Sequence, residues 1–216
     1  MTKRLSLLVA EIIICFAVAI TLPASAQTLY EDGPINGQTD AWTINFGFVL
    51  GDTFTLSAGN STVTGLAFGA WLYPGDVLES VQVILSTQEI GEGTQFFNGV
   101  VNFTQSNCFL NGYSYDVCTE TGSFTPTHLL EGTYWVTLQN AIVNDGDPVY
   151  WDENSGIGCH SPGCPSEASN GSIGTLPAEA FTILGTTGAG SVPEPGSLLL
   201  FASGVVALGG VLRRSF

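Results

Sequence analysis

Apolar and polar residues alternate over most of the chain, as they do in strands whose two faces meet different surroundings. The segment 62–73, TVTGLAFGAWLY, places one apolar set on a single face of a strand: Leu66, Phe68, Ala70 and Leu72. The segment 42–50, WTINFGFVL, does the same with Trp42, Ile44, Phe46 and Phe48. Further segments of strand length follow at 79–87, 97–105, 132–143 and 179–185.

Asn, Gly, Asp and Pro separate these segments, and helical periodicity is absent between the two ends of the chain. Many short strands with turn residues at near-regular spacing are typical of sandwiches and jelly rolls. The pattern therefore predicts an all-β fold, a single β-sandwich or jelly-roll-like domain over residues 27–185. We expect roughly eight to ten strands, with bounds uncertain by ~2–4 residues.

The charged residues are distributed very unevenly. All four cations lie at the ends, as Lys3, Arg4, Arg213 and Arg214. Glu11 and Glu194 lie in the end segments, so 17 of the 19 acidic residues belong to the body. Binding to phosphates needs Lys or Arg, so this charge excludes nucleic acid as a partner.

The N-terminus has the pattern of a secretory signal peptide over residues 1–26. Two cations precede an apolar run, and Ala24-Ser25-Ala26 forms a small-residue cleavage site before Gln27. The sequence therefore predicts export, with Gln27 as the first residue of the mature chain.

The C-terminus predicts a membrane anchor. Residues 196–212 carry no charge, and 17 residues of helix span about 25 Å, near the short limit for a bilayer core of about 30 Å. Arg213 and Arg214 stay on the cytoplasmic side, which places the body outside. The run 186–191 before this region has the composition of a flexible linker.

The motif Val192-Pro193-Glu194-Pro195 stands directly before the anchor. Together with the helix and the pair Arg213-Arg214, it resembles the PEP-CTERM sorting signal. The resemblance implies that residues 192–216 are recognised by an exosortase, a membrane protease, in bacteria that make extracellular polysaccharide. Stretches of the body also resemble uncharacterised PEP-CTERM proteins. An ordinary C-terminal anchor is the alternative.

Four cysteines remain after removal of the signal peptide: Cys108, Cys118, Cys159 and Cys164. An even number in an exported chain favours two disulfides, and proximity favours Cys108–Cys118 and Cys159–Cys164 among three connectivities. A two-residue turn at Asn111-Gly112 would pair Cys108 with Tyr115. Either the loop is longer, or the bridge closes outside the ladder. A zinc site that includes Cys159, His160 and Cys164 is the alternative for the second pair.

The sequence contains little evidence for a catalytic site. A serine triad needs a histidine base, but only His128 and His160 are available and no serine has a nucleophile motif around it. Asp76, Glu79, Asp152 and Glu153 match a glycosidase by residue type alone. We therefore expect no enzyme.

Two ligand classes remain open. The acidic segment 144–154 offers hard oxygen ligands for calcium at Asp145, Asp147, Asp152 and Glu153, with Asn144 and Asn154 beside them. A solvated loop is the alternative. Aromatic side chains that could stack on sugars are Trp71, Tyr73, Trp135, Tyr150 and Trp151. The favoured candidates are Trp135 and Trp151. Trp135 follows Tyr134 in a strand, so one of the two faces outward, and Trp151 lies beside the acidic residues.

The sequence thus predicts an exported protein, tethered transiently in the inner membrane and then delivered to the cell surface or extracellular matrix. Its expected role is structural or adhesive and without catalysis. A carbohydrate-binding module for extracellular polysaccharide, assisted by calcium, is the alternative.

Overall fold

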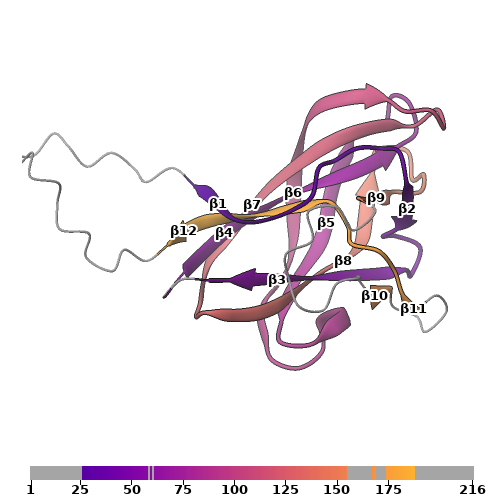
Figure 1. Cartoon of the computed structure of the whole chain (residues 1–216). Coiled ribbons are helices and arrows are strands. Elements are labelled where there is room, and N and C mark those ends of the chain that lie inside the picture. Colours follow the sequence, from indigo (N-terminus) through magenta and orange to yellow (C-terminus); the bar gives the residue numbers. More distant parts are fainter. Residues whose placement is uncertain (1–25, 58, 60, 155–166, 169–173, 188–216) are drawn as a thin grey trace, which may run out of the picture.

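The computed structural model describes residues 26–57, 59, 61–154, 167–168 and 174–187 (Figure 1). Within these residues the chain forms strands and one short 3₁₀ turn, η1 (Glu89–Gly91). The strands are β1 (Gln27–Asp32), β2 (Asp40–Thr43), β3 (Val49–Leu56), β4 (Ser61–Leu72), β5 (Leu78–Ser86), β6 (Gln95–Leu110), β7 (Asp116–Leu129), β8 (Gly132–Val143), β9 (Tyr150–Glu153), β10 (Glu167–Ala168), β11 (Gly174–Thr175) and β12 (Phe181–Thr187). The predicted all-β class is confirmed.

The strands form two antiparallel layers that share one long strand. The first layer has the order β1-β12-β4-β7-β6, and the second continues as β6-β5-β8-β3 with β10 and β11 beyond it. Residues 95–102 of β6 pair with β5, and residues 103–110 pair with β7. Strand β6 therefore passes from one layer to the other. On the opposite side β1 lies against β3, so the sandwich is nearly barrel-like.

The core lies between the layers and confirms the strongest alternation in the sequence. Leu66, Phe68, Ala70 and Leu72 of β4 are all fully buried. Phe68 meets the ring of Trp151 with centroids 6.1 Å apart. Burying a large apolar side chain stabilises a fold by about 1.5–3 kcal/mol. These four residues therefore determine which face of β4 points into the core.

The segment 42–50 is two strands and a turn, so the prediction of one continuous strand is wrong. Phe46 has a positive φ of 54° and is 65% exposed, and the amide of Phe48 donates to the carbonyl of Asn45 across the turn. Asn and Gly favour such turns. Apolar residues happen to occupy every second position through this turn as well, so the sequence pattern does not reveal it.

Strand β9 completes the end of the sandwich that carries the sites described below. Trp151 of β9 pairs with Ala70 of β4, directly beyond the pair that Phe181 of β12 forms with Phe68. On its other side β9 pairs with β2. The acidic segment is therefore partly a buried strand and only partly a loop.

No helix within the described parts of the chain is long and apolar enough to cross a membrane. The predicted helix 196–212, the linker and the sorting motif lie outside the described residues, as does the signal peptide up to Ser25. Strand β1 begins at Gln27, immediately after the predicted cleavage site.

Candidate functional site

An aromatic cleft opens at the end of the sandwich where β2, β4 and β9 meet the β6–β7 hairpin. Its volume is about 370 Å³. Its lining residues are Thr39, Asp40, Ala41, Trp71, Tyr113, Tyr115 and Tyr150. Four of the seven are aromatic, and they come from three parts of the chain that are far apart in sequence.

The aromatic rings form one connected surface. Trp71 and Tyr113 are stacked with centroids 5.6 Å apart and planes inclined by 22°. Tyr115 contacts Trp71 at 5.8 Å and Tyr150 at 5.5 Å, and it also meets Tyr73 at 5.1 Å. Trp71 is 5% exposed whereas Tyr113 is 60% exposed. Trp71 therefore forms the floor of the cleft and Tyr113 its rim.

A buried carboxylate fixes this floor from behind. Oδ1 of Asp152 accepts a hydrogen bond of 2.6 Å from the indole Nε1 of Trp71. The same carboxylate accepts from the backbone amides of Asn36 at 2.8 Å and Gly37 at 3.1 Å. Burial raises the pKa of Asp152, and these three donors oppose the rise by stabilising the charged form.

The hairpin that carries Tyr113 and Tyr115 is held by a disulfide and an asparagine. Cys108 and Cys118 form the predicted bridge. The loop between β6 and β7 spans residues 111–115, and Leu110 pairs with Asp116, so the longer loop is the correct alternative. Oδ1 of Asn111 accepts from the amides of Tyr113 at 2.9 Å and Tyr115 at 3.0 Å. The second cysteine pair and the zinc alternative at Cys159, His160 and Cys164 lie outside the described residues.

Three carboxylates gather beside the cleft, from Asp76, Asp145 and Asp147. One oxygen of each lies within 4.8 Å of the others. Burial, the contact with Asp145 and repulsion from Asp145 and Asp147 raise the pKa of Asp76 to about 6. We call this set the three-carboxylate cluster.

The structure separates the four carboxylates that the sequence groups as calcium ligands into two pairs. Asp145 and Asp147 lie together, but their partner is Asp76, from a turn that precedes them by almost seventy residues. Asp152 instead anchors Trp71, and Oε2 of Glu153 accepts a hydrogen bond of 2.9 Å from the indole of Trp42. Asp152 and Glu153 are buried residues of strand β9, so the alternative of a solvated loop does not hold for this part of the segment.

The two tryptophans chosen as sugar-stacking candidates are not in the cleft. Trp151 is 0% exposed and donates its indole N–H to the carbonyl of Ala180, so its prediction is wrong: the ring is part of the core. Trp135 is half-buried on β8, while its neighbour Tyr134 is buried. Of Tyr134 and Trp135, Trp135 is therefore the one that faces outward, as expected for one of the two. It lies in the second layer, on β8, and not at the cleft.

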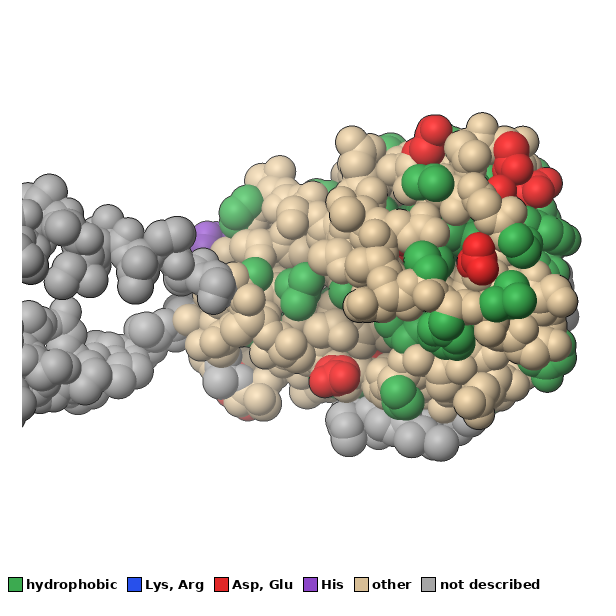
Figure 2. Space-filling view, turned by 90° about the horizontal axis from the view of Figure 1, so that it is seen from above, with side chains coloured by type: hydrophobic (Ala, Val, Ile, Leu, Met, Phe, Trp, Pro, Cys, Tyr) green, Lys and Arg blue, Asp and Glu red, His purple; other side chains and the backbone are tan. Residues whose placement is uncertain are grey.

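Other carboxylates are buried in the body without cations. Burial raises the pKa of Glu120 to about 7, and neither of its carboxylate oxygens has a hydrogen-bond partner in the described part of the chain. Burial and the nearby carboxylate of Asp52 raise the pKa of Glu179 well above its ordinary value. Figure 2 shows acidic and apolar side chains gathered on the end of the body away from the histidine, with no Lys or Arg on this face.

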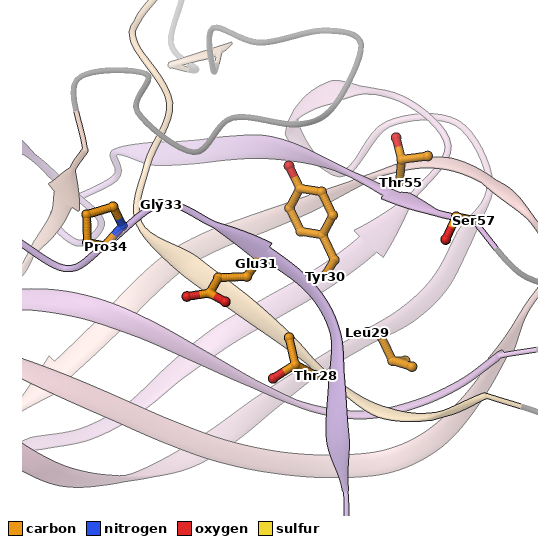
Figure 3. Close-up of a pocket in the computed structure, with 8 residues that line it drawn as sticks. All are labelled: Thr28, Leu29, Tyr30, Glu31, Gly33, Pro34, Thr55 and Ser57. Carbon is orange, nitrogen blue, oxygen red and sulfur yellow. The ribbon is translucent and has the colours of Figure 1, made fainter.

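A second hollow of about 630 Å³ lies at the seam between β1 and the end of β3. Figure 3 shows Tyr30 reaching from β1 toward the chain that carries Thr55 and Ser57. Glu31 is the acid on this lining. Tyr30 is its one aromatic residue, so the seam lacks the continuous ring surface of the cleft.

Comparison with known proteins identifies the C-terminal segment. Residues 191–214 match the family model of the PEP-CTERM protein-sorting motif. The chain carries a PEP-CTERM sorting signal. The PEP-CTERM motif indicates an exported protein that is processed by exosortase, a membrane protein, and released to the surface after anchored sorting. No curated protein matches the chain.

Proposed function

We propose that this PEP-CTERM protein is a non-catalytic, adhesive component of the cell surface whose body binds extracellular polysaccharide in the aromatic cleft. The observation that carries the proposal is the stacked pair of Trp71 and Tyr113, at the floor and the rim of a cleft of about 370 Å³. Aromatic faces offer the apolar C–H faces of sugar rings a flat contact surface, and tyrosine hydroxyls add hydrogen bonds at the rim.

The charge of the protein narrows the ligand class. The body contains 17 acidic residues and no Lys or Arg, and Asp40 lines the cleft. Polysaccharides rich in uronate or sulfate would be repelled by this field, because like charges at a binding surface cost affinity. A neutral or amino-sugar polymer fits the cleft best.

Sugar hydrolysis needs a pair of carboxylates, and the described residues that line the cleft do not supply one. Of its described lining residues, Asp40 alone is acidic. Asp152 lies behind Trp71, where three donors already occupy its carboxylate. Glycosidases place two carboxyl groups about 5–9.5 Å apart across the scissile bond. Binding without turnover is the activity that this arrangement supports.

Affinity electrophoresis in gels containing neutral, amino-sugar or acidic polysaccharides tests the proposal. We expect retardation of the full chain by a neutral or amino-sugar polymer, and a loss of at least tenfold in affinity for Tyr113→Ala. Tyr113 is the rim residue, so its replacement leaves the core intact. Trp135→Ala is the matched control, because it removes an outward-facing aromatic from the other layer. Absence of retardation by every polymer would remove the sugar-binding role and leave a structural one.

A further inference from the structure

The three-carboxylate cluster is built by two turns that are tied to each other. The amide of Asp76 donates to the carbonyl of Tyr73 at 3.0 Å, and the amide of Gly146 donates to the carbonyl of Val143 at 3.3 Å. Between the turns, Oδ1 of Asn144 accepts from the amide of Val77 at 2.8 Å, and the amide of Asn144 donates to the carbonyl of Val77 at 3.2 Å. The turns therefore hold the carboxylates together before any ligand arrives.

One carboxylate oxygen of the cluster is buried and accepts no hydrogen bond within the described part of the chain. Asp76 is 5% exposed, and its Oδ2 has no hydrogen-bond partner among the residues that the structure describes. Its carboxylate lies in the group whose oxygens are within 4.8 Å of one another. A buried polar atom without a partner typically costs about 1–3 kcal/mol, so this oxygen needs a positive ligand or a proton.

We propose that Asp76, Asp145 and Asp147 bind a divalent cation of the calcium class. Calcium binds oxygen ligands at about 2.3–2.6 Å, so oxygens around one ion lie at most about 5 Å apart, which agrees with the spacing of the cluster. The cluster contains no nitrogen or sulfur ligand, which disfavours zinc and copper. Asp145 is exposed, so water molecules complete the coordination on that side.

The location of the protein suits this ligand. The sorting motif indicates export, and extracellular calcium modules bind with dissociation constants of about 10⁻⁴–10⁻³ M. Bound calcium would also offset the repulsion among carboxylates in a body that has no Lys or Arg. The inference does not depend on the proposed sugar-binding cleft.

Thermal melts and terbium luminescence on the full chain in detergent test the site. We expect millimolar calcium to raise the melting temperature by about 5 °C relative to chelator. Terbium binds calcium sites and should give sensitised emission, and added calcium should displace the terbium and lower this emission. Asp76→Asn should lose at least tenfold in calcium affinity, yet melt no lower than the wild type in chelator, because it removes one of three repelling charges. Asp145→Asn, at the exposed member, should lose the calcium response as well.

Glu131→Gln is the matched control, because it also removes one acid, at an exposed position away from the cluster. Glu131 follows the end of the β4–β7 ladder at Leu129, whereas the turn that carries Asp76 lies at the other end, near Asp116. It should keep the full calcium shift. Tyr113→Ala should also keep it, which separates this site from the sugar-binding proposal. Equal melting temperatures of the wild type in calcium and chelator would overturn the inference. So would an undiminished calcium shift in Asp76→Asn. A wild type that is insensitive to calcium, but whose gain in stability near pH 5 shrinks in Asp76→Asn, would show that a proton fills the role of the cation.

Discussion

The indole N–H of Trp71 and the carboxylate of Asp152 form a hydrogen bond of 2.6 Å across the floor of the aromatic cleft. The partners belong to β4 and β9, which are paired at the end of the first layer. One face of the Trp71 ring is stacked against Tyr113, while its N–H edge points to a buried acid. The acid therefore sets the orientation of the ring that forms the floor of the cleft and supports Tyr113.

Asp152→Ala should destabilise the protein more than a typical point mutation does. It leaves three donors without an acceptor, on Trp71, Asn36 and Gly37. At about 1–3 kcal/mol for each buried donor, we expect a loss of about 3 kcal/mol or more in the free energy of unfolding. Asp152→Asn keeps one oxygen acceptor and should lose less. Chemical denaturation measures both, and equal stability of the alanine variant and the wild type would contradict the anchoring role.

The Cys108–Cys118 bridge should stabilise the fold and shape the cleft. Its loop of about ten residues implies roughly 2–3 kcal/mol from the restricted unfolded chain. The double variant Cys108→Ser with Cys118→Ser should therefore melt several degrees lower and bind polysaccharide more weakly, because the hairpin carries Tyr113 and Tyr115. Reduction of the wild type by dithiothreitol should lower the melting temperature at least as far, because it also reduces the bridge expected between Cys159 and Cys164. A double variant with an unchanged melting temperature would show that the β6–β7 ladder and Asn111 hold the hairpin without the bridge.

The fold could be predicted from sequence where alternation and burial agree. On β4, the residues that share one face in the sequence are the residues that the core buries, from Leu66 to Leu72. The pattern misled where a turn happened to keep a period of two, as at Phe46. It also misled at Trp151 and Asp152, since a strand of four residues is too short to show a period.

The site depends on long-range pairing that no local pattern contains. Trp71 and Tyr150 meet because β4 pairs with β9, and Asp76 meets Asp145 because two turns lie at the same end of the sandwich. Residue type did single out some members of each group: Asp145 and Asp147 of the three-carboxylate cluster, and Trp71 and Tyr150 of the cleft. Choosing the right members required the register of the sheet.

Replacement of Pro193, Glu194 and Pro195 by alanine should block processing while leaving the body folded. The motif match indicates processing by exosortase, and the three residues stand directly before the apolar run 196–212. We expect the variant to stay in the membrane fraction and the wild type to reach the surface or medium. Intact mass separates the outcomes, since a retained chain keeps Arg213 and Arg214. Release of the triple-alanine chain at the wild-type rate would contradict recognition of this motif.

Glu120→Gln should make the protein more stable at pH 8 and change it little at pH 4. Burial raises the pKa of Glu120 from 4.5 to about 7, so the folded state resists ionisation. Below pH 4.5 the folded and unfolded chains both carry the proton. As the pH rises to about 7, the unfolded chain releases it first, and the free energy of unfolding falls. Above about pH 7 the loss approaches its limit, which is about 3.5 kcal/mol for a shift of this size.

The glutamine has nearly the same shape and cannot ionise, so its stability should depend less on pH between 4.5 and 7. The comparison must be between the two proteins at each pH, because other raised carboxyl groups, such as Asp76 and Glu179, titrate in both. Glu131→Gln, at an exposed position, controls for the loss of one negative charge from the whole body. If the stability curves of Glu120→Gln and the wild type ran parallel from pH 4 to pH 8, Glu120 would have to be ionised at no cost inside the sandwich. That result would require a compensating group that the described residues do not contain.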